Sequence, residues 1–216
     1  MTSPATLSVP LSNDVVRSWY DAVGSGIERA ERHEGRAKAI AMSLLKVVPG
    51  AHGLNVGVGA GHEQRRLQDA AGSDALVVGV DVSSGMLNYA RQRMSSTFCK
   101  ADIRALPFRG ASFDFVFSAY VLDLLPTDQL LDAVIELRRA LRPGGRMVLV
   151  SLTEGVDVWS RTFIAVWKWR YRLSPALLGG CRPLRLRGIA ERAGFTVVDD
   201  RVVVQRGFPS EIIVAE

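Results

Sequence analysis

Apolar residues recur at helical spacing along the first fifty positions of the chain. The first set follows Asn13, a residue type that caps helices, and comprises Val15, Val16, Trp19 and Val23. The second set comprises Ile27, Ala30, Ala37, Ile40, Leu44 and Val48. Pro49 and Gly50 then interrupt the pattern. We therefore expect N-terminal helices within residues 1–48.

After this point the chain alternates between short apolar runs and longer amphipathic stretches. The apolar runs predict strands over residues 53–58, 75–81, 96–102, 112–119, 144–152, 195–205 and 209–216. The amphipathic stretches predict helices over residues 62–71, 83–94, 127–141 and 184–194. No internal repeat or low-complexity segment interrupts this order.

Strands that alternate with helices of this length predict an α/β fold with a doubly wound, mostly parallel seven-stranded sheet. The last two strands are joined by a short polar link, so we expect an antiparallel C-terminal edge hairpin. Ligands of such sheets bind beyond the carboxyl ends of the strands, where the strand order reverses. We expect residues 1–216 to form a single domain, which is consistent with the chain length.

Composition narrows the class of protein. The N-terminal stretch lacks the basic and apolar regions of a signal peptide, and no apolar run reaches the roughly 20 residues of a membrane-spanning helix. Cys99 and Cys181 are too few for a disulfide framework and lack metal-ligand spacing. We expect a cytoplasmic protein with reduced thiols and no bound metal.

Residues 54–63 read LNVGVGAGHE, an apolar run that breaks into alternating glycines. Gly57, Gly59 and Gly61 would let the main chain pass close beneath a ligand. The dinucleotide fingerprint G-x-G-x-x-G is not met, because His62 stands where its third glycine belongs. The loop therefore indicates nucleotide binding of another kind, with a tight strand-to-helix turn without a ligand as the alternative.

Four stretches, in order, resemble the motifs of the class I S-adenosylmethionine-dependent methyltransferases. They read NVGVGAG, VVGVDVSSGML, CKADIRALPFRGASFDFVFSAYVL and LRRALRPGGRMVLVS. The resemblance runs from about residue 15 to the C-terminus. Within that superfamily the chain is most similar to the small methyltransferases of ubiquinone and menaquinone biosynthesis and of phosphatidylethanolamine N-methylation.

The resemblance implies a site for S-adenosylmethionine, with S-adenosylhomocysteine as its product, around the glycine loop. Contacts would come from Gly57, Val58, Gly59 and Gly61, and the following helix would offer free N–H groups to the carboxylate of the ligand. Asn55 stands where the family usually has Asp or Glu. It would accept a hydrogen bond from the ammonium of the ligand without the charge of a carboxylate.

Residues at the ends of later strands complete the implied cofactor site. Asp81 would accept hydrogen bonds from the ribose hydroxyls, with a cap of the next helix as the alternative. Asp102 would accept from the adenine amino group beside the backbone N–H of Ile103, unless it is a solvated loop residue. Val82 and Met86 would pack on the ligand, although Met86 is equally suited to the helix core. Ser118 and Ala119 would lie beneath the reacting methyl.

Methyl transfer needs alignment and exclusion of water more than a strong acid or base, although a hydroxyl acceptor still needs a base. The catalytic candidates are Tyr20 and Asp123. Tyr20 resembles the tyrosine that covers the cofactor in this family, with a core position as the alternative. Asp123 lies where related enzymes place acceptor-facing side chains, although a loop or N-cap role fits equally well. Tyr120 and Arg182 are the expected acceptor contacts, Arg182 through a phosphate or carboxylate.

Of the three histidines, His62 is a further candidate near the mouth of the site. His33 and His52 fall on a helix and in a turn, so we expect both on the surface.

Residues 153–187 lie where this superfamily inserts a lid over the acceptor. The net charge of the chain is +5, and residues 158–190 contain no acid. The cations of this stretch are Arg161, Lys168, Arg170, Arg172, Arg182, Arg185 and Arg187, and its tryptophans are Trp159, Trp167 and Trp169. Such a segment suits an anionic membrane surface, a nucleic-acid face, or a lid core whose cations reach the solvent.

We therefore expect methyl transfer from S-adenosylmethionine to a small-molecule or lipid-like acceptor, such as a quinone precursor or a phospholipid amine. Residues 158–187 would also touch the periphery of a membrane. One alternative is an RNA methyltransferase, which rests on basic charge alone and lacks an appended RNA module. Another is a non-catalytic S-adenosylmethionine-binding protein, for which Asn55 is the only indication. A nicotinamide-dependent oxidoreductase is disfavoured by His62.

Overall fold

The computed structural model describes residues 31–216 together with Val15, Ser18 and Asp21. The strands are β1 (Gly53–Val56), β2 (Val77–Asp81), β3 (Thr97–Lys100), β4 (Phe113–Ala119), β5 (Leu141–Leu152), β6 (Val197–Gln205) and β7 (Phe208–Ala215). The α-helices are α2 (Glu31–Leu45), α3 (His62–Ala71), α4 (Ser84–Arg93), α5 (Leu130–Ala140), α6 (Val158–Leu173) and α7 (Arg187–Arg192). Short 3-10 turns span Leu122–Leu124, Thr127–Gln129 and Pro175–Leu178.

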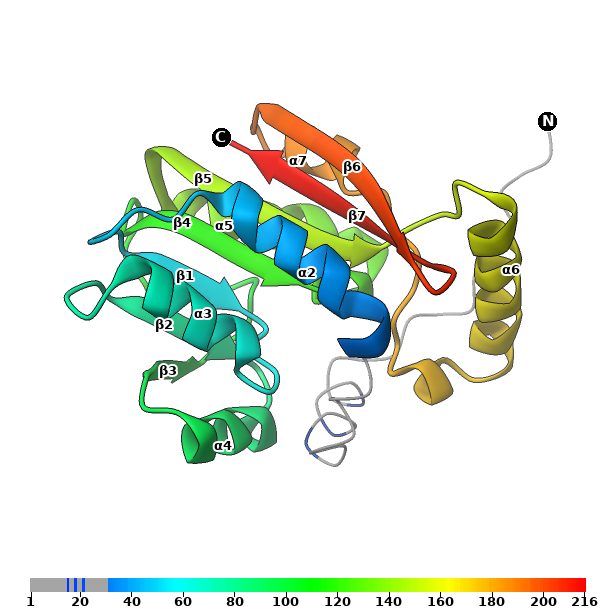
Figure 1. The fold of residues 1–216 in the computed structure, drawn as a ribbon, viewed down its shortest axis with the longest axis horizontal. Helices are drawn as coiled ribbons and strands as arrows, with labels where there is room; N and C mark the ends of the chain where they lie inside the picture. The colour runs from blue at the N-terminus through cyan, green and yellow to red at the C-terminus, as the bar shows by residue number, and fades with distance from the viewer. Residues whose placement is uncertain (1–14, 16–17, 19–20, 22–30) are drawn as a thin grey trace.

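The strands form one seven-stranded sheet in the order β3-β2-β1-β4-β5-β7-β6. The first five strands pair in parallel, and β7 runs antiparallel to both β5 and β6. The predicted fold class and the antiparallel edge hairpin are therefore confirmed. Strand order reverses between β1 and β4, and the carboxyl ends of the parallel strands point toward the side where α6 stands (Figure 1).

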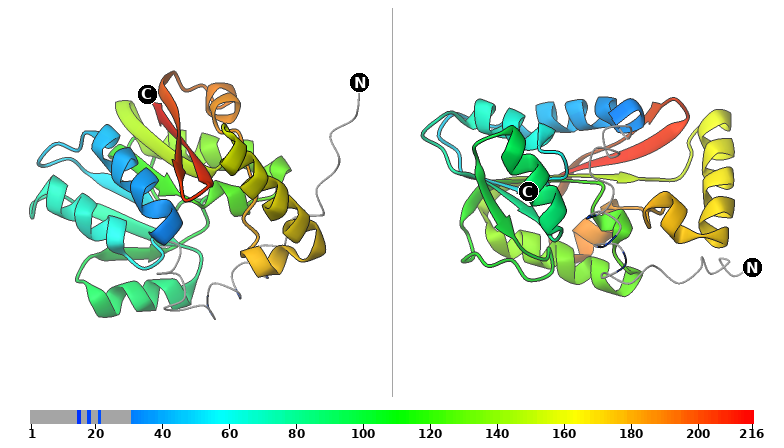
Figure 2. Two further views of the ribbon diagram at one scale, coloured as in Figure 1. Left: turned by 45° about the vertical axis from the view of Figure 1, so that its right-hand side comes forward. Right: turned by 90° about the horizontal axis from the view of Figure 1, so that it is seen from below.

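Helices cover both faces of the sheet because its side chains alternate between two cores. Met147 and Leu149 of β5 belong to a core shared with α5 and α7. Val148 and Val150 belong to the opposite core, shared with α2 and α3. The view from below shows α2 and α3 on one side of the sheet and α5 on the other (Figure 2).

Most element boundaries differ from the predicted ones by a few residues. Strand β1 ends at Val56 rather than at residue 58, since Gly57 turns into a left-handed conformation with φ of 81°. Helix α7 begins three residues later than predicted, because Leu184 N–H donates to the carbonyl of Leu152 and keeps the preceding stretch extended along β5. Of the helices predicted within residues 1–48, only α2 lies in the described part of the chain.

Strand β1 approaches β4 so closely that one position of the pair accepts only glycine. Gly53 faces Phe115, and a Cβ at residue 53 would lie 2.0–2.6 Å from three atoms of that ring. We expect Gly53→Ala to lower the free energy of unfolding by about 1–3 kcal/mol through overpacking. Urea denaturation measures this, with Gly188→Ala as the control, because a Cβ at this α7 position would meet nothing within 4 Å. Equal stability of the two variants would contradict the β1–β4 register.

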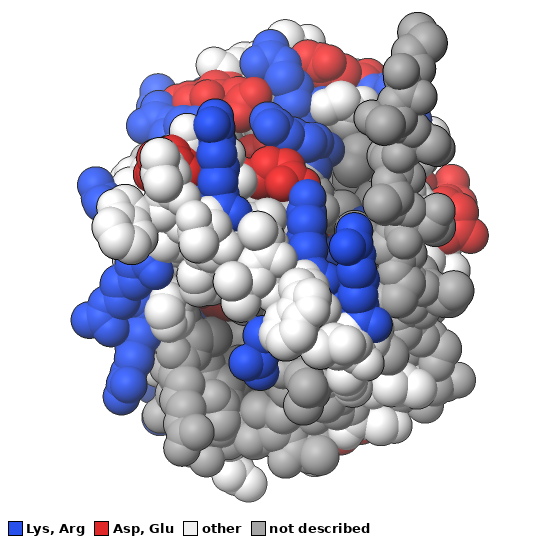
Figure 3. Space-filling model, turned by 90° about the vertical axis from the view of Figure 1, so that its right-hand side faces the viewer, with Lys and Arg blue, Asp and Glu red and all other residues white. Residues whose placement is uncertain are grey.

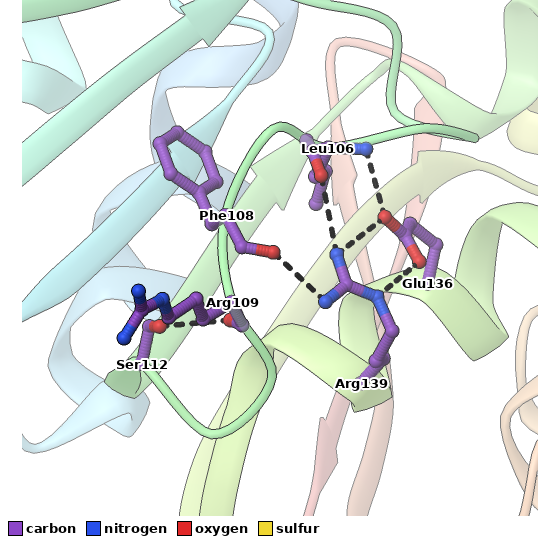
Figure 4. Close-up of polar contacts among 6 residues, drawn as sticks. All are labelled: Leu106, Phe108, Arg109, Ser112, Glu136 and Arg139. Atoms are coloured by element: carbon purple, nitrogen blue, oxygen red, sulfur yellow. Dashed lines mark hydrogen bonds and ion pairs between the residues drawn. The ribbon is translucent and has the colours of Figure 1, made fainter.

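The loop between β3 and β4, which carries Asp102, is held to α5 by hydrogen bonds between its backbone and the ion-paired side chains of Glu136 and Arg139. Arg139 bonds Glu136 at 2.7 Å and donates to the carbonyls of Leu106 and Phe108. Glu136 accepts in turn from the N–H of Leu106 at 2.8 Å (Figure 4). The loop is therefore held along its length before it reaches the sheet.

Candidate active site

The glycine loop leaves β1 at the point where strand order reverses. Gly57, Gly59 and Gly61 have φ angles of 81°, 51° and 86°, which residues with a Cβ rarely adopt. A Cβ at Gly57 would lie 2.1 Å from Cγ2 of Val121, and one at Gly61 would lie 3.3 Å from Ala90. These two glycines therefore allow close packing of the turn after β4 and of α4, in addition to any role under a ligand.

Asp81 ends β2 beside this loop. Its carboxylate accepts from the N–H of Gly59 at 3.1 Å and from the N–H of Ser83 at 2.9 Å. Burial raises the pKa of Asp81, and the nearby Asp21 carboxylate adds to the rise. The helix-cap alternative is wrong, because Ser83 caps α4 by accepting from Met86 N–H at 3.0 Å.

Asp21 was missed by the sequence analysis. Its carboxylate accepts from the N–H of Gly85 at 2.9 Å and from the hydroxyl of Ser83. Asp21 therefore lies at the start of α4, next to Asp81. Its position directly after Tyr20 in the sequence could have identified it as a site residue. Tyr20 itself lies outside the described residues.

Asn55 does not face the mouth of the site, so the predicted contact with the ligand ammonium is wrong. Its side chain is buried and donates to the carboxamide of Gln64 at 3.1 Å. Gln64 donates in turn to the carbonyl of Val77 and to the hydroxyl of Ser96. Asn55 therefore links β1 to α3. At this buried position the two side-chain amides of Asn55 and Gln64 bond each other, and no charge has to be buried.

Val58, Val82 and Met86, three of the apolar residues assigned to the cofactor, have different surroundings. Val82 is 37% exposed directly after Asp81, so its side chain is available to a ligand. Met86 and Val58 are fully buried, and Val58 packs under the loop toward Gly79. For Met86 the core alternative therefore holds. The side chain of Val58 also belongs to the core, so its predicted contact with the cofactor would have to come from its main chain.

Asp102 is engaged by a neighbour two residues along the chain. Arg104 donates to its carboxylate from Nε at 2.8 Å, from Nη2, and from its backbone N–H at 2.9 Å. These bonds lower the pKa of Asp102 below its usual range. The carboxylate remains partly exposed and ionised, so a contact with adenine stays a prediction, as does one with the N–H of the adjacent, buried Ile103.

The end of β4 supplies Ser118 and Tyr120. Ser118 is buried, and its hydroxyl has no hydrogen-bond partner among the described residues. Tyr120 has a left-handed φ of 57°, a conformation that is costly for an aromatic residue. Its hydroxyl bonds that of Ser210 at 2.7 Å, and burial raises its pKa well above the usual value, so it cannot serve as a base.

Asp123 lies fully buried in the turn after β4. Its Oδ2 accepts from Sγ of Cys181 at 3.0 Å and from the N–H of Leu152 at 3.3 Å. Its Oδ1 has no hydrogen-bond partner within the described part of the chain. Burial raises the pKa of Asp123 to about 6, although Arg182 acts in the opposite direction. The structure therefore holds a carboxylate with one unused oxygen at the strand ends.

Arg182 is buried next to this carboxylate. It donates to the carbonyl of Leu125 at 2.6 Å, and its backbone N–H donates to the carbonyl of Asp123 at 3.2 Å. Its Nε lacks a hydrogen-bond partner among the residues that the structure describes. Arg182 thus fastens the segment after α6 to the turn after β4, and its contact with an acceptor anion stays a prediction.

An aromatic cluster joins α6 to the start of β7. Phe208 packs against Phe163, Trp167 and Tyr120 with ring centroids 5.8–6.0 Å apart. His33 of α2 joins the cluster, 6.1 Å from Phe208, and its Nδ1 is buried. The prediction that His33 is a surface histidine is therefore wrong, whereas His62 is exposed at the start of α3.

Residues 54–145 match a family model described as a methyltransferase domain. Over this stretch, which is less than half of the 216 residues, the chain is similar to S-adenosylmethionine-dependent methyltransferases. The resemblance predicted from the four motifs is thereby confirmed.

Curated proteins that are similar to this chain include ones named for different acceptors. Demethylmenaquinone methyltransferase of Bacillus licheniformis is 31% identical over 139 residues, which cover 62% of this chain and 58% of the relative. Malonyl-acyl-carrier-protein O-methyltransferase of Enterobacter lignolyticus is 33% identical over 135 residues, covering 61% of this chain and 52% of the relative. The matches span less than two thirds of these relatives, so they do not identify the acceptor of this chain.

Solved structures share the fold of this chain. Magnesium protoporphyrin IX methyltransferase from Synechocystis, with S-adenosylhomocysteine bound, aligns with a TM-score of 0.72 at 20% identity, covering 94% of this chain and 99% of that one. A chain from a complex with the Haloferax volcanii Trm112 methyltransferase activator aligns with a TM-score of 0.74 at 22% identity, covering 93% and 96%. The cyclase SpnF also aligns, with a TM-score of 0.64 at 19% identity, covering 83% and 79%. The fold alone therefore does not decide the chemistry.

A hollow lies beside the start of β5, away from the glycine loop. It encloses about 370 Å³ and is lined by Arg138, Arg142, Gly144 and Glu216, among others. Because these residues surround the start of β5, the hollow lies at the opposite end of the sheet from the carboxyl ends of the strands. No cluster of potential metal ligands occurs among the described residues.

Proposed function

We propose that this chain transfers a methyl group from S-adenosylmethionine to a small-molecule or lipid-like acceptor. The observation that carries the proposal is the juxtaposition of the glycine loop and Asp81 at the reversal of strand order. Bonding of Gly59 N–H to Asp81 holds the carboxylate against the loop, where a ribose with two adjacent hydroxyls would find an acceptor. The family match over residues 54–145 supports the same ligand.

The described residues fit S-adenosylmethionine in part. Gly57, Gly59 and Gly61 would pass beneath it, Asp81 would hold its ribose, and Val82 would cover an apolar part of it. Asp102 keeps acceptor capacity for the adenine amino group beyond its bonds to Arg104. When bound, S-adenosylmethionine would supply an electrophilic methyl group on a sulfonium.

On the acceptor side, the unused Oδ1 of Asp123 is the proposed general base. At neutral pH a carboxyl with a pKa of about 6 is mostly ionised, so it could take a proton from a hydroxyl acceptor. Ser118 would lie beneath the reacting methyl and Tyr120 beside the acceptor. The buried Arg182 would hold Asp123 in place and offer Nε to an anionic group.

The acceptor is proposed to be amphiphilic, such as a quinone precursor or a phospholipid amine. The aromatic cluster under the lid suits an apolar ring or chain, and residues 153–187 would form the lid over it. Such a compound resides in membranes. The protein, which we propose to be cytoplasmic, would reach it by peripheral contact through residues 158–187. No helix within the described residues is long and apolar enough to cross a bilayer.

A transfer assay with methyl-labelled S-adenosylmethionine tests the proposal. The purified protein is incubated separately with a demethylated quinone, with phosphatidylethanolamine and with transfer RNA, and each product is separated by phase extraction. We expect label in the quinone or phospholipid phase. Label in RNA, or no transfer to any acceptor despite binding of S-adenosylhomocysteine, would contradict it.

A further inference from the structure

Helix α6 carries a stripe of large apolar side chains that face away from the protein. Trp159 is 81% exposed, Trp169 60% and Leu173 65%, and Val166 is also exposed. Large aromatic and aliphatic side chains are seldom this exposed together on one helix. Among the described residues, nothing covers the outward face of α6, which is therefore an exposed apolar surface.

The four residues form one continuous line. Trp159, Val166, Trp169 and Leu173 are separated by seven, three and four positions, and at 3.6 residues per turn they fall on the same side of the helix. Val158, which is 75% exposed, extends the line at its N-terminal end. This face runs the full length of the helix, which gives it the geometry of an interfacial element.

The opposite face of α6 is firmly attached, so the stripe is presented by a fixed element. Ile164 is buried with Leu152 and Phe208, and Trp167 donates from Nε1 to the carbonyl of Cys181 at 2.9 Å. A reciprocal cap between Asp157 and Ser160 closes the N-terminus of the helix. Of the three tryptophans in the segment, only Trp167 belongs to the lid core.

Positive charge borders the stripe on both sides. At 3.6 residues per turn, Arg170 lies along one edge of the apolar stripe, and Arg161 and Arg172 lie along the other edge. None of the three forms an ion pair with a described residue, and α6 contains no acid. Lys and Arg side chains stand beside uncharged side chains on this side of the molecule (Figure 3).

We propose that the outward face of α6 adsorbs to the surface of an anionic lipid bilayer. Tryptophan, valine and leucine would enter the boundary between head groups and acyl chains, while the arginines contact lipid phosphates. A second copy of the chain is a poorer occupant, because antiparallel α6 helices would bring arginines together with no acid on either helix. A nucleic acid would neutralise the arginines but leave valine and leucine uncovered.

The inference deepens the proposed function, since it says where the protein would meet a lipid-like acceptor. It is tested without any methyl transfer, so the two can fail separately.

The experiment is co-sedimentation of the full chain with phosphatidylcholine vesicles that contain or lack phosphatidylglycerol, at low and high salt. We expect binding only to the vesicles with phosphatidylglycerol, and loss of that binding at high salt. Trp159→Ser with Trp169→Ser should abolish it. Arg170→Gln with Arg172→Gln should weaken partitioning by roughly fivefold for each charge removed.

Matched controls distinguish binding through this surface from nonspecific hydrophobic adsorption and from an effect of net charge. Val48→Ser with Ile135→Ser removes exposed apolar side chains elsewhere, and Arg66→Gln with Arg109→Gln removes the same net charge from other surfaces. Both controls should bind vesicles as the wild type does. All variants should bind S-adenosylhomocysteine equally, which shows that they are folded.

Several results would overturn the inference. They are the absence of sedimentation with phosphatidylglycerol vesicles at low salt, equal binding to neutral vesicles, and unchanged binding of the tryptophan variant. A dimer in analytical ultracentrifugation that the tryptophan variant dissociates would also overturn it, because it would identify a second copy as the occupant.

Discussion

Asp123→Asn is expected to lower methyl transfer to a hydroxyl acceptor by about 10²–10⁴-fold, the usual contribution of a positioned general base. The variant keeps an oxygen that can accept from Cys181 and Leu152, so the turn after β4 should stay in place. What it loses is the ability to take a proton at Oδ1. In the wild type, the rate should rise with pH through about 6 and then level off, and the variant should lack this rise.

The same substitution should stabilise the fold at neutral pH. Burial raises the pKa of Asp123 from 3.8 to about 6, so the folded state binds the proton more tightly than the unfolded state does. The stability that this proton provides is complete below pH 3.8 and is lost as pH rises through about 6. At 1.36 kcal/mol per pKa unit, ionising Asp123 costs the folded protein on the order of 3 kcal/mol above that range.

Urea unfolding of both proteins at about pH 4 and about pH 8 measures this effect. Other titrating groups contribute equally to both proteins, so the difference between them isolates residue 123. We expect Asp123→Asn to gain most of the 3 kcal/mol at the higher pH relative to the lower, an order-of-magnitude figure. Asp128→Asn is the control, as an exposed aspartate in the same segment. Equal pH dependence in wild type and variant would show that Asp123 is not ionised inside the protein.

Asp81→Ala is expected to weaken S-adenosylmethionine binding by about 1–3 kcal/mol, because charge-assisted hydrogen bonds to the ribose are lost. The fold should survive, since the carboxylate lies at the strand end, where it bonds backbone N–H groups such as those of Gly59 and Ser83. Burial raises the pKa of Asp81, so wild-type affinity should also fall as the solution becomes acidic and the carboxylate is protonated.

Equilibrium dialysis with labelled S-adenosylmethionine measures the change. Asp74→Ala is the matched control, because Asp74 is exposed just before β2 and lies outside the proposed site. If Asp81→Ala and Asp74→Ala bind alike, the ribose is not at Asp81.

The sheet was predictable because period-two and period-3.6 patterns report directly on which side chains are buried. The seven strands and the helices between them follow from those periods, and the edge hairpin follows from the short link before β7. The boundaries were less predictable. Strand β1 ends where Gly57 turns, and α7 starts late because Leu184 bonds to a strand that lies far away in sequence.

The site was predictable where a residue's role depends on its place in the strand. Asp81 ends β2 beside the loop as expected, whereas Asn55, one residue before the end of β1, points toward α3 and bonds Gln64. The position of a residue in a sequence motif does not show which other side chain it will bond in the folded protein. The bond between Cys181 and Asp123 joins residues 58 positions apart, and no local pattern indicates it.

The central claim is that S-adenosylmethionine binds at the carboxyl ends of β1 and β2. A crystal structure with S-adenosylhomocysteine tests it most directly. We predict density with the ribose hydroxyls at Asp81 and the methionine part over the loop from Gly57 to Gly61. Density instead in the hollow beside Arg138 and Arg142, at the other end of the sheet, would contradict it, as would a protein that binds no S-adenosylhomocysteine.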